Sequence, residues 1–344
     1  MVTTFEKFSL AREIFLNWER RDTVKQFSRI VFLNRLSISR ILCVLTAFAC
    51  LAFGTIAAPA ATPPYDAIYV FGDSYCDVGN IFAATSHAIP ASPPYFHGRF
   101  SNGPIWIEHV AGVWGLPMVA SLLPGGTDYA FGGAYVTIPE NISLGIPPSV
   151  PQQVATYLSS VHGHADPKAL YVIEGGGNDI LGAGALGVTG AQAADNLGFQ
   201  IARSIFESEL ALRRAGAENF LIPDLLDVGQ LPAATAFASF ASAATVATNE
   251  ELDRLLEFEE SFGRVRIHRL DVFSLFHDIA ADATHFGFTN ITVPCLILSP
   301  LGCADPDHTL FWDAEHLTEF GHSFIAVMVE TRLGIDAKRL KDPR

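Results

Sequence analysis

A serine, an aspartate and a histidine in this 344-residue chain have the types and settings that nucleophilic catalysis needs. Ser74 follows the apolar run 67–71 and Gly72, a residue that lets the backbone turn sharply. Far downstream, Asp313 precedes His316 by three residues, so one loop can bring the carboxylate to the imidazole. Serine, histidine and carboxylate are the parts of an acyl-transfer triad, which is recognised by roles and not by chain order.

The elements that must position these residues follow from the apolar pattern. A continuous apolar run such as 67–71 is typical of a strand buried on both faces of a parallel sheet. Similar runs alternate with segments of helical spacing, which indicates a parallel sheet covered by helices on both sides. We expect strands at 67–71, 128–134, 169–173, 219–223 and 265–270, and helices at 105–113, 152–160, 191–214, 241–262 and 319–333. The prediction is a three-layer α/β/α sandwich around a mainly parallel, five-stranded sheet.

Three of the expected strands end in glycine-rich turns that carry candidate site residues. These are Ser74, the pair Gly132 and Gly133, and Asn178. The carboxyl ends of parallel strands lie along one edge of a sheet, where such sheets place their ligands. We therefore expect these residues to meet at one site.

Taken together, these segments resemble the GDSL esterase/lipase family, also called SGNH hydrolases. The resemblance extends from about residue 67 to about residue 330, and it implies the flavodoxin-like fold of SGNH hydrolases. The matching blocks are Phe71-Gly72-Asp73-Ser74-x-x-Asp77-x-Gly79-Asn80, residues 98–103, residues 129–134, Gly176-Gly177-Asn178-Asp179 and Phe311-Trp312-Asp313-x-x-His316-x-Thr318.

The resemblance implies a role for each site residue. Ser74 becomes the nucleophile, His316 the general base and Asp313 the partner that orients it. The backbone N–H groups of Ser74 and Gly133 and the side-chain amide of Asn178 become the oxyanion hole. Gly133 is preferred to its neighbour Gly132 by alignment alone.

Three positions depart from the family pattern. Tyr75 replaces the leucine that gives the family its name, and Thr318 stands where a proline is frequent. Asp128 opens its block in place of the usual asparagine, so the hydrogen bonding there is expected to differ.

The activity that the resemblance implies is hydrolysis of acyl or acetyl esters through an acyl-enzyme. The substrate is expected to be a small-molecule, lipid or acetylated-carbohydrate ester. No cofactor or metal is expected; Asp305, Asp307 and His308 lie close together, but solvation of a loop explains them equally well. Two alternatives stay open: acyl transfer to an alcohol acceptor, and an inactive carbohydrate- or lipid-binding module on the same fold.

Charge and the N-terminal segment bear on partners and location. The net charge is −14 although residues 1–40 are basic, and so acidic a body would repel phosphate backbones, which argues against nucleic-acid binding. The apolar run 41–53 and the small residues after it are typical of a secretory signal peptide. A signal anchor over 41–58 is the alternative, and membrane contact is expected only if this segment is uncleaved.

We therefore predict an N-terminal piece, 1–60, outside the fold, and one hydrolase domain, 61–344, secreted and monomeric. Cysteine usage agrees with secretion. Cys295 and Cys303 bracket a short loop that suits a disulfide, which would leave Cys76 as a buried thiol.

Overall fold

The computed structural model describes residues 3–30, 64–138, 145–263 and 265–333. Its sheet has four parallel strands in the order β1-β2-β3-β4. Ile68 pairs with Leu170, Leu170 with Asn219 and Asn219 with Arg266, so the carboxyl ends of all four strands lie at one edge. The strands are β1 (Ile68–Phe71), β2 (Leu170–Ile173), β3 (Asn219–Pro223) and β4 (Arg266–Leu270).

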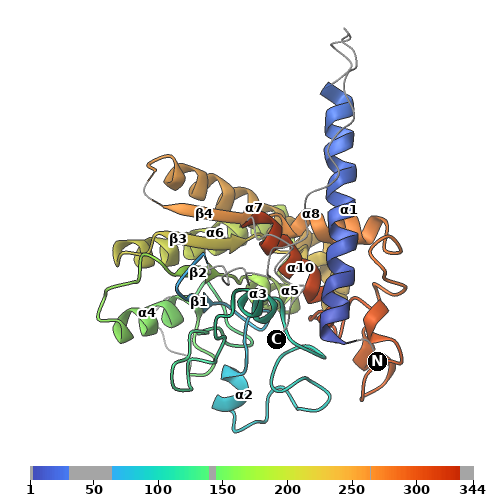
Figure 1. Cartoon of the computed structure of the whole chain (residues 1–344), viewed down its shortest axis with the longest axis horizontal. Helices are drawn as coiled ribbons and strands as arrows, with labels where there is room; N and C mark the ends of the chain where they lie inside the picture. The colour runs from blue at the N-terminus through green and yellow to red at the C-terminus, as the bar shows by residue number, and fades with distance from the viewer. Residues whose placement is uncertain (1–2, 31–63, 139–144, 264, 334–344) are drawn as a thin grey trace, which may run out of the picture.

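Helices flank this sheet (Figure 1), which confirms the predicted α/β architecture. Helix α6 packs against α7 and α4, whereas α3 packs against α10. The helices are α1 (Thr4–Ile30), α2 (Asn80–Ala84), α3 (Trp106–Trp114), α4 (Val150–Ser160), α5 (Gly177–Ala185), α6 (Ala191–Arg214), α7 (Ala238–Glu260), α8 (Val272–Ala281), α9 (Cys295–Leu298) and α10 (Glu319–Arg332), with 3-10 turns at Val228–Gln230, Pro232–Phe237 and Pro306–His308.

The prediction of a fifth strand at 128–134 was wrong. The segment runs beside β1, where Tyr129 N–H donates to Val70 C=O (2.7 Å), but only an isolated bridge joins it to the sheet. The Asn80 side-chain amide donates to the carbonyls of Asp128 (2.8 Å) and Ala130 (2.9 Å). The turn at residues 131–134 then carries the chain away, so no strand ladder develops.

The N-terminal helix differs from the expectation that residues 1–60 lie outside the fold. Helix α1 packs against α10, and its lower part lies along the body of the molecule in Figure 1. Phe8, Ala11 and Phe15 are buried in the hydrophobic core. The predicted leader or anchor at 41–58 lies outside the described residues, and no helix within the described ranges is long and apolar enough to cross a membrane.

The cysteines are arranged in one pair and one single residue. Cys295 and Cys303 form a disulfide. Cys76 is free and fully buried just after the nucleophile turn, and burial raises the pKa of its thiol well above the usual value. It is therefore an inert packing residue at neutral pH.

Candidate active site

Ser74, His316 and Asp313 lie in one continuous chain of hydrogen bonds. Ser74 Oγ is 2.7 Å from His316 Nε2, and His316 Nδ1 is 2.8 Å from both carboxylate oxygens of Asp313. Because a carboxylate can only accept, Nδ1 carries the proton and Nε2 is free to accept from the serine. This is the arrangement in which a serine hydroxyl can lose its proton as it attacks.

A side chain of α4 makes hydrogen bonds to the backbone of the turn that presents Ser74. Gln153 is 1% exposed and binds Gly72 on both sides. Its Oε1 accepts the Gly72 N–H (2.9 Å), and its Nε2 donates to the Gly72 C=O (2.9 Å). Beyond Ser74, the Tyr75 N–H donates to Asp73 Oδ1 (3.0 Å). The serine thus stands on a turn whose backbone is fixed at both ends.

Asp313 and His316 occupy the tip of a short hairpin. Phe311 and Leu317 form an antiparallel bridge, and Trp312 N–H donates to His316 C=O (2.8 Å). The Glu315 and His316 N–H groups both donate to Asp313 Oδ1 (2.8 Å each). Because Asp313 and His316 are three residues apart, one loop places the carboxylate against the imidazole.

Electrostatics at the site favour a charged Asp313 and a basic His316. Burial opposes charge on Asp313, but His316 and a hydrogen bond from Tyr95 Oη (2.6 Å) outweigh burial and hold the pKa of Asp313 well below its usual value. Burial would lower the pKa of His316, yet Asp313 outweighs it and raises that pKa. His316 is consequently a stronger base than a free histidine.

The three predicted oxyanion-hole donors differ in the hydrogen bonds that they make. Within the described residues, neither the Ser74 N–H nor the Gly133 N–H donates to another group. The Gly132 N–H is committed to Asp77 Oδ2 (2.8 Å), which favours Gly133 over Gly132. Gly133 has a φ of +79°, a conformation that glycine adopts readily.

Asn178 stands at the start of α5 and lines the same cavity as Ser74 and His316. Its Nδ2 donates to Asp73 Oδ2 (3.2 Å) and to Ala134 C=O (3.0 Å). These contacts orient the amide, and the longer one to Asp73 is the one that an oxyanion could replace. Gly133 is not among the residues that line the cavity.

A pair of buried carboxyl groups adjoins the nucleophile. Burial raises the pKa of Asp73 to about 6, and it raises that of Glu174 well above the usual value, with Asp73 contributing further. Like charges this close disfavour double ionisation, so Glu174 keeps its proton at neutral pH. The pair therefore carries at most one negative charge behind the serine.

Asp77 and Asp128 tie the nucleophile turn to the segment that carries Gly133. Asp77 is fully buried and accepts hydrogen bonds from four backbone N–H groups, at residues 79, 80, 81 and 132. The Asp128 carboxylate accepts from Val78 N–H (2.8 Å) and Ala130 N–H (2.9 Å). The unusual aspartate at 128 thus serves as a double acceptor, and burial followed by Asp77 raises its pKa well above the usual value.

A cavity of about 60 Å³ opens beside the hydrogen-bond chain. Its apolar walls come from the ends of β3 and β4 and from α5, among them Leu181, Leu225 and Val272. Its polar lining includes four carboxyl side chains and no lysine or arginine. The apolar walls suit an acyl group, and the acidic residues disfavour an anionic ligand.

The loop residues Asp305, Asp307 and His308 make separate contacts. His308 Nδ1 is 2.8 Å from Asp305 Oδ1, whereas Asp307 forms an ion pair with Lys7. Within the described part of the chain, no three histidine, cysteine, aspartate or glutamate side chains converge on a point that could hold a metal ion.

A parallel sheet with a Ser-His-Asp hydrogen-bond chain at its carboxyl edge defines an α/β protein with a site of the serine-hydrolase type. The chain belongs to the GDSL-like Lipase/Acylhydrolase family, whose model matches residues 68–328. That match covers every strand of the sheet and all of the site residues described above.

Individual relatives are distant. The chain is 27% identical to a phosphatidylcholine-sterol acyltransferase of Aeromonas hydrophila, over 70% of this chain and 68% of the relative. It is 26% identical to a thermolabile hemolysin of Vibrio parahaemolyticus, over 75% of this chain but only 62% of that protein's length. A GDSL esterase/lipase of Arabidopsis thaliana is 25% identical over 74% of this chain and 81% of its own. Among solved structures, an alpha/beta hydrolase enzyme from the metagenome of Lake Arreo aligns with 80% of this chain and 97% of its own, at a TM-score of 0.43 and 12% identity.

Sequence reasoning missed three residues of the site: Tyr95, Gln153 and Glu174. Tyr95 reaches Asp313 across 218 positions, and Gln153 reaches Gly72 across 81. Neither contact has a local signature, since both depend on how distant segments pack. Glu174 did carry a signal, because it directly follows β2 at the sheet edge where the site lies.

Proposed function

We propose that this chain hydrolyses carboxylic esters through an acyl-enzyme formed on Ser74. The observation that carries the proposal is the unbroken hydrogen-bond chain from Ser74 through His316 to Asp313, with separations of 2.7 and 2.8 Å. Membership of the family supports hydrolase chemistry in general.

The proposed reaction has two halves. Ser74 Oγ attacks the ester carbonyl carbon while His316 Nε2 takes the hydroxyl proton, and the tetrahedral intermediate collapses as His316 returns that proton to the leaving alcohol. Water then attacks the acyl-enzyme by the same route and releases the acid. Asp313 stays ionised throughout and stabilises the imidazolium.

The negative charge of each tetrahedral intermediate needs donors that are already in place. The unengaged N–H groups of Ser74 and Gly133 support this role, as does the Asn178 amide at the same cavity. For Asn178 to take part, its hydrogen bond to Asp73 must give way to one with the oxyanion. This bond (3.2 Å) is longer than the one to Ala134 C=O (3.0 Å), so it is the one that we expect the oxyanion to replace.

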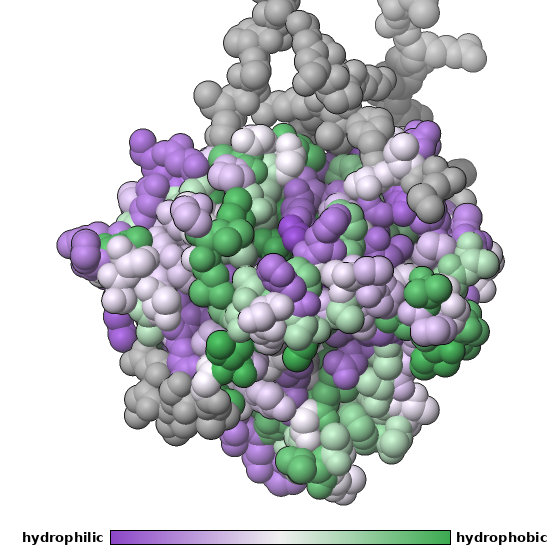
Figure 2. Space-filling view, turned by 90° about the horizontal axis from the view of Figure 1, so that it is seen from below, coloured by the Kyte–Doolittle hydropathy of each residue, from purple (hydrophilic) through white to green (hydrophobic). Residues whose placement is uncertain are grey.

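The cavity supports a neutral ester with an apolar acyl group as the substrate. Asp73, Glu174 and Glu315 line it beside the leucines, and no cationic side chain there would pair with a phosphate. The face of the molecule in Figure 2 carries hydrophobic residues in separate groups between hydrophilic ones, so that face offers no broad apolar field to a lipid aggregate. The acidic lining of the cavity, without lysine or arginine, therefore favours a small-molecule or acetylated-carbohydrate ester over a phospholipid.

The test compares the chain with its Ser74→Ala variant. The unmodified protein should react once per chain with a fluorophosphonate and should hydrolyse p-nitrophenyl acetate, whereas Ser74→Ala should do neither. Acetyl to decanoyl esters, assayed beside acetylated xylooligosaccharides, define the substrate. Adding a simple alcohol shows whether acyl transfer competes with water, as the name of the Aeromonas relative suggests for that protein.

Two results would contradict the proposal. One is labelling of Ser74→Ala at the same rate as the unmodified chain. The other is a properly folded protein that neither reacts with the fluorophosphonate nor hydrolyses any ester of the series, which would favour a binding module on this fold.

A further inference from the structure

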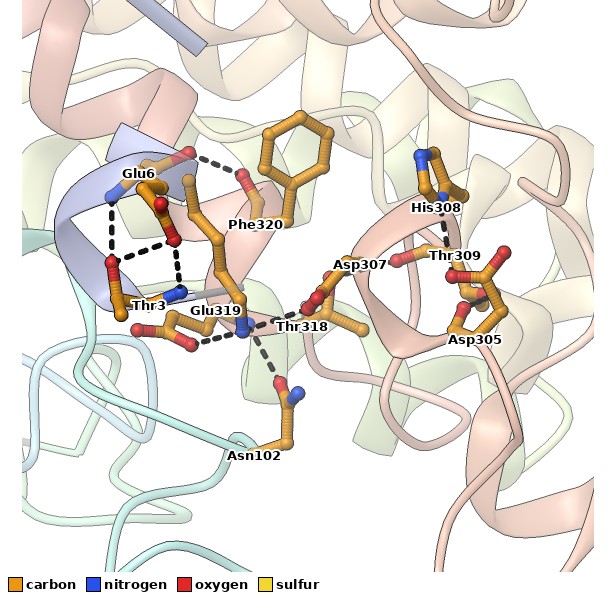
Figure 3. Close-up of polar contacts among 12 residues, drawn as sticks. Thr3, Glu6, Asn102, Asp305, Asp307, His308, Thr309, Thr318, Glu319 and Phe320 are labelled. Carbon is orange, nitrogen blue, oxygen red and sulfur yellow. Dashed lines mark hydrogen bonds and ion pairs between the residues drawn. The ribbon is translucent and has the colours of Figure 1, made fainter. Parts of the chain in front are cut away.

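Lys7, in the first turn of α1, lies against the hairpin that carries Asp313 and His316. Its Nζ is 2.7 Å from Asp307 Oδ1 and 2.6 Å from Glu319 Oε2, and the lysine is only 8% exposed. Figure 3 shows the start of α1, with Thr3 and Glu6, beside Glu319, and Asp307 facing the same point.

The two carboxylates that Lys7 binds lie at the two ends of the hairpin. Asp307 precedes its neck and Glu319 follows it. The neck itself is closed by Thr318, whose N–H donates to Leu310 C=O (2.9 Å) and whose Oγ1 donates to Thr309 C=O (2.7 Å). Lys7 thus joins the 3-10 turn that precedes the hairpin to the first residue of α10, which follows it, while Asp313 and His316 occupy the tip of the hairpin.

We propose that Lys7 is a positioning residue for this hairpin, and that α1 is thereby a working part of the catalytic domain. The inference rests on the proposed function, in which the position of His316 relative to Ser74 governs the rate. A shift of about 1 Å in a catalytic group can cost about 10²-fold in rate. Loss of the Lys7 contacts could therefore lower the rate by a larger factor than the small stability of one ion pair would suggest, because it would let His316 move relative to Ser74.

The surroundings of Glu319 make Lys7 hard to replace. The Glu319 side chain is 5% exposed, and within the described residues its Oε1 has no hydrogen-bond partner. Gly103 packs so closely that an added Cβ would lie 2.5 Å from the Glu319 Cδ. Without Lys7, a buried carboxylate would lose its cation and would have to move toward water, which would pull the end of the hairpin with it.

Lys7 keeps its positive charge. Burial would lower the pKa of Lys7, but its hydrogen bonds to Asp307 and Glu319 outweigh burial and raise it. The lysine therefore stays protonated over the whole range in which His316 titrates, so the contact persists wherever the enzyme is active.

Helix α1 has other contacts that keep it in place when Lys7 is changed. Phe8 stacks on His109 with ring centroids 5.3 Å apart, and the ring centroids of Trp18 and Phe286 are 6.2 Å apart. Arg12 is 3.8 Å from Glu330, which lies near the far end of α10. Arg12 thus provides a matched control: a cation of α1 that pairs with a buried glutamate and does not touch the hairpin.

The proposal conflicts with the expected fate of residues 1–60. Cleavage of the predicted signal peptide after the apolar run 41–53 would remove α1 from the mature chain. Retention of that run as a membrane span would place α1 and the hydrolase domain on opposite sides of the bilayer. A chain that works as proposed therefore keeps residues 3–30 attached and on the same side as the domain.

The experiment uses the full chain with Lys7→Met, Lys7→Arg and Arg12→Met. It measures the rate at which a fluorophosphonate labels Ser74, kcat and KM for p-nitrophenyl acetate, and Tm. We expect Lys7→Met to lower the labelling rate and kcat by about tenfold or more with little change in KM. Lys7→Arg should restore most of both, and Arg12→Met should label at the unmodified rate.

A second variant separates positioning from loss of folding. Lys7→Met combined with Glu319→Gln removes the uncompensated charge, so it should label faster than Lys7→Met alone. The inference is overturned if Lys7→Met labels as fast as Arg12→Met, if the double variant gives no recovery, or if an exported chain lacking residues 1–60 retains the kcat and Tm of the full chain. Failure of the unmodified full chain to label at all would instead overturn the proposed function.

Discussion

The Asp313 carboxylate has four hydrogen-bond donors around it. Its Oδ1 accepts two backbone N–H groups, its Oδ2 accepts the Tyr95 hydroxyl, and His316 Nδ1 lies within 2.8 Å of both oxygens. Each donor spreads the negative charge and so limits how strongly Asp313 attracts the imidazolium. The basicity of His316 therefore depends on the groups that donate to Asp313 as well as on Asp313 itself.

Tyr95→Phe tests this control of basicity. Removing the hydroxyl leaves more negative charge on Asp313, so the pKa of His316 should rise further above 6.5. Because the base must be neutral, the acid limb of kcat/KM against pH should move to higher pH. The loss of a charge-assisted hydrogen bond, worth about 1.5–3 kcal/mol, gives roughly a tenfold lower kcat/KM at pH 6.

The matched control is Tyr75→Phe, which removes a hydroxyl that donates to the neutral carbonyl of Glu315 (2.8 Å). That variant should leave the midpoint of the acid limb where it is. An unchanged midpoint in Tyr95→Phe, or the same shift in both variants, would contradict a role for Tyr95 in setting the basicity of His316.

Asn178→Ala tests the proposed role of the Asn178 amide as the third donor of the oxyanion hole. We expect kcat to fall by about 10²–10³-fold with little change in KM, the usual result of removing one such donor. The amide also donates to Ala134 C=O, so Tm should be measured beside the kinetics. A kcat near the unmodified value in a folded variant would exclude Asn178 from the mechanism.

At the scale of elements, the nucleophile turn depends on α4. At the start of helix α4, Gln152 Oε1 accepts the Ser149 N–H (2.8 Å), and the next residue, Gln153, points inward to Gly72. The helix therefore acts as a bracket for the turn after β1. Its register matters because a shift by one residue would put Gln152 or Val154 in the place of Gln153.

Gln153→Leu should remove this bracket. The Gly72 N–H would lose its acceptor, whereas the Gly72 C=O would keep the Phe131 N–H (3.1 Å). One buried donor left unpaired costs about 1–3 kcal/mol in the free energy of unfolding. Since the turn carries Ser74, kcat should fall as well.

Gln152→Leu is the control for that variant, because it disturbs the start of the same helix without touching Gly72. It should cost about 1 kcal/mol or less and leave kcat close to normal. Denaturant unfolding and ester hydrolysis are measured on both variants. Equal effects of the two changes on kcat would contradict the role of Gln153 in fixing the turn that carries Ser74.

Elements with a clear local period were predictable from the sequence, and those defined by distant partners were not. Helix α6 has the predicted bounds because its apolar face repeats over 24 residues. The segment 128–134 looked like a strand, but the Asn80 side chain takes the carbonyls that a neighbouring strand would have used. Helix α1 did have a signal, the apolar spacing of Phe8, Ala11 and Phe15, which its basic charge obscured.

The same distinction applies to the site. Ser74, Asp313 and His316 could be predicted because family motifs mark them, and the strand before Ser74 could be predicted from five apolar residues. Whether they act as a catalytic triad stays a prediction until the Ser74 test is done. The contacts that tune them join segments up to 218 positions apart, and no pattern along the chain encodes such a distance.

At the scale of the whole molecule, the acidic composition extends into the core. Several buried glutamates have a single cation nearby or none, among them Glu209 and Glu330. A buried acid whose pKa is raised in the folded state makes folding less favourable as pH rises. The molecule should consequently be more stable at mildly acidic pH than above neutrality.

Glu209 on α6 allows this pH dependence of stability to be tested at a single residue. It is fully buried, and within the described residues neither carboxylate oxygen has a hydrogen-bond partner. Burial and then the nearby Glu259 raise its pKa to about 7, although Arg213 opposes them. In the unfolded chain the group titrates near 4.5. Between these two values the unfolded state releases a proton that the folded state keeps, so the free energy of unfolding falls with rising pH and levels off above about 7.

Glu209→Gln should therefore match the unmodified protein near pH 4.5 and exceed it at pH 8 by up to about 3 kcal/mol in the free energy of unfolding. The control is Glu207→Gln on the same helix, whose exposed side chain pairs with Arg203 and should change stability by less than about 0.5 kcal/mol at either pH. Urea unfolding at the two pH values measures the difference. A Glu209→Gln variant that gains nothing between pH 4.5 and 8 would mean that this carboxyl is already ionised when folded, with Arg213 as a sufficient partner.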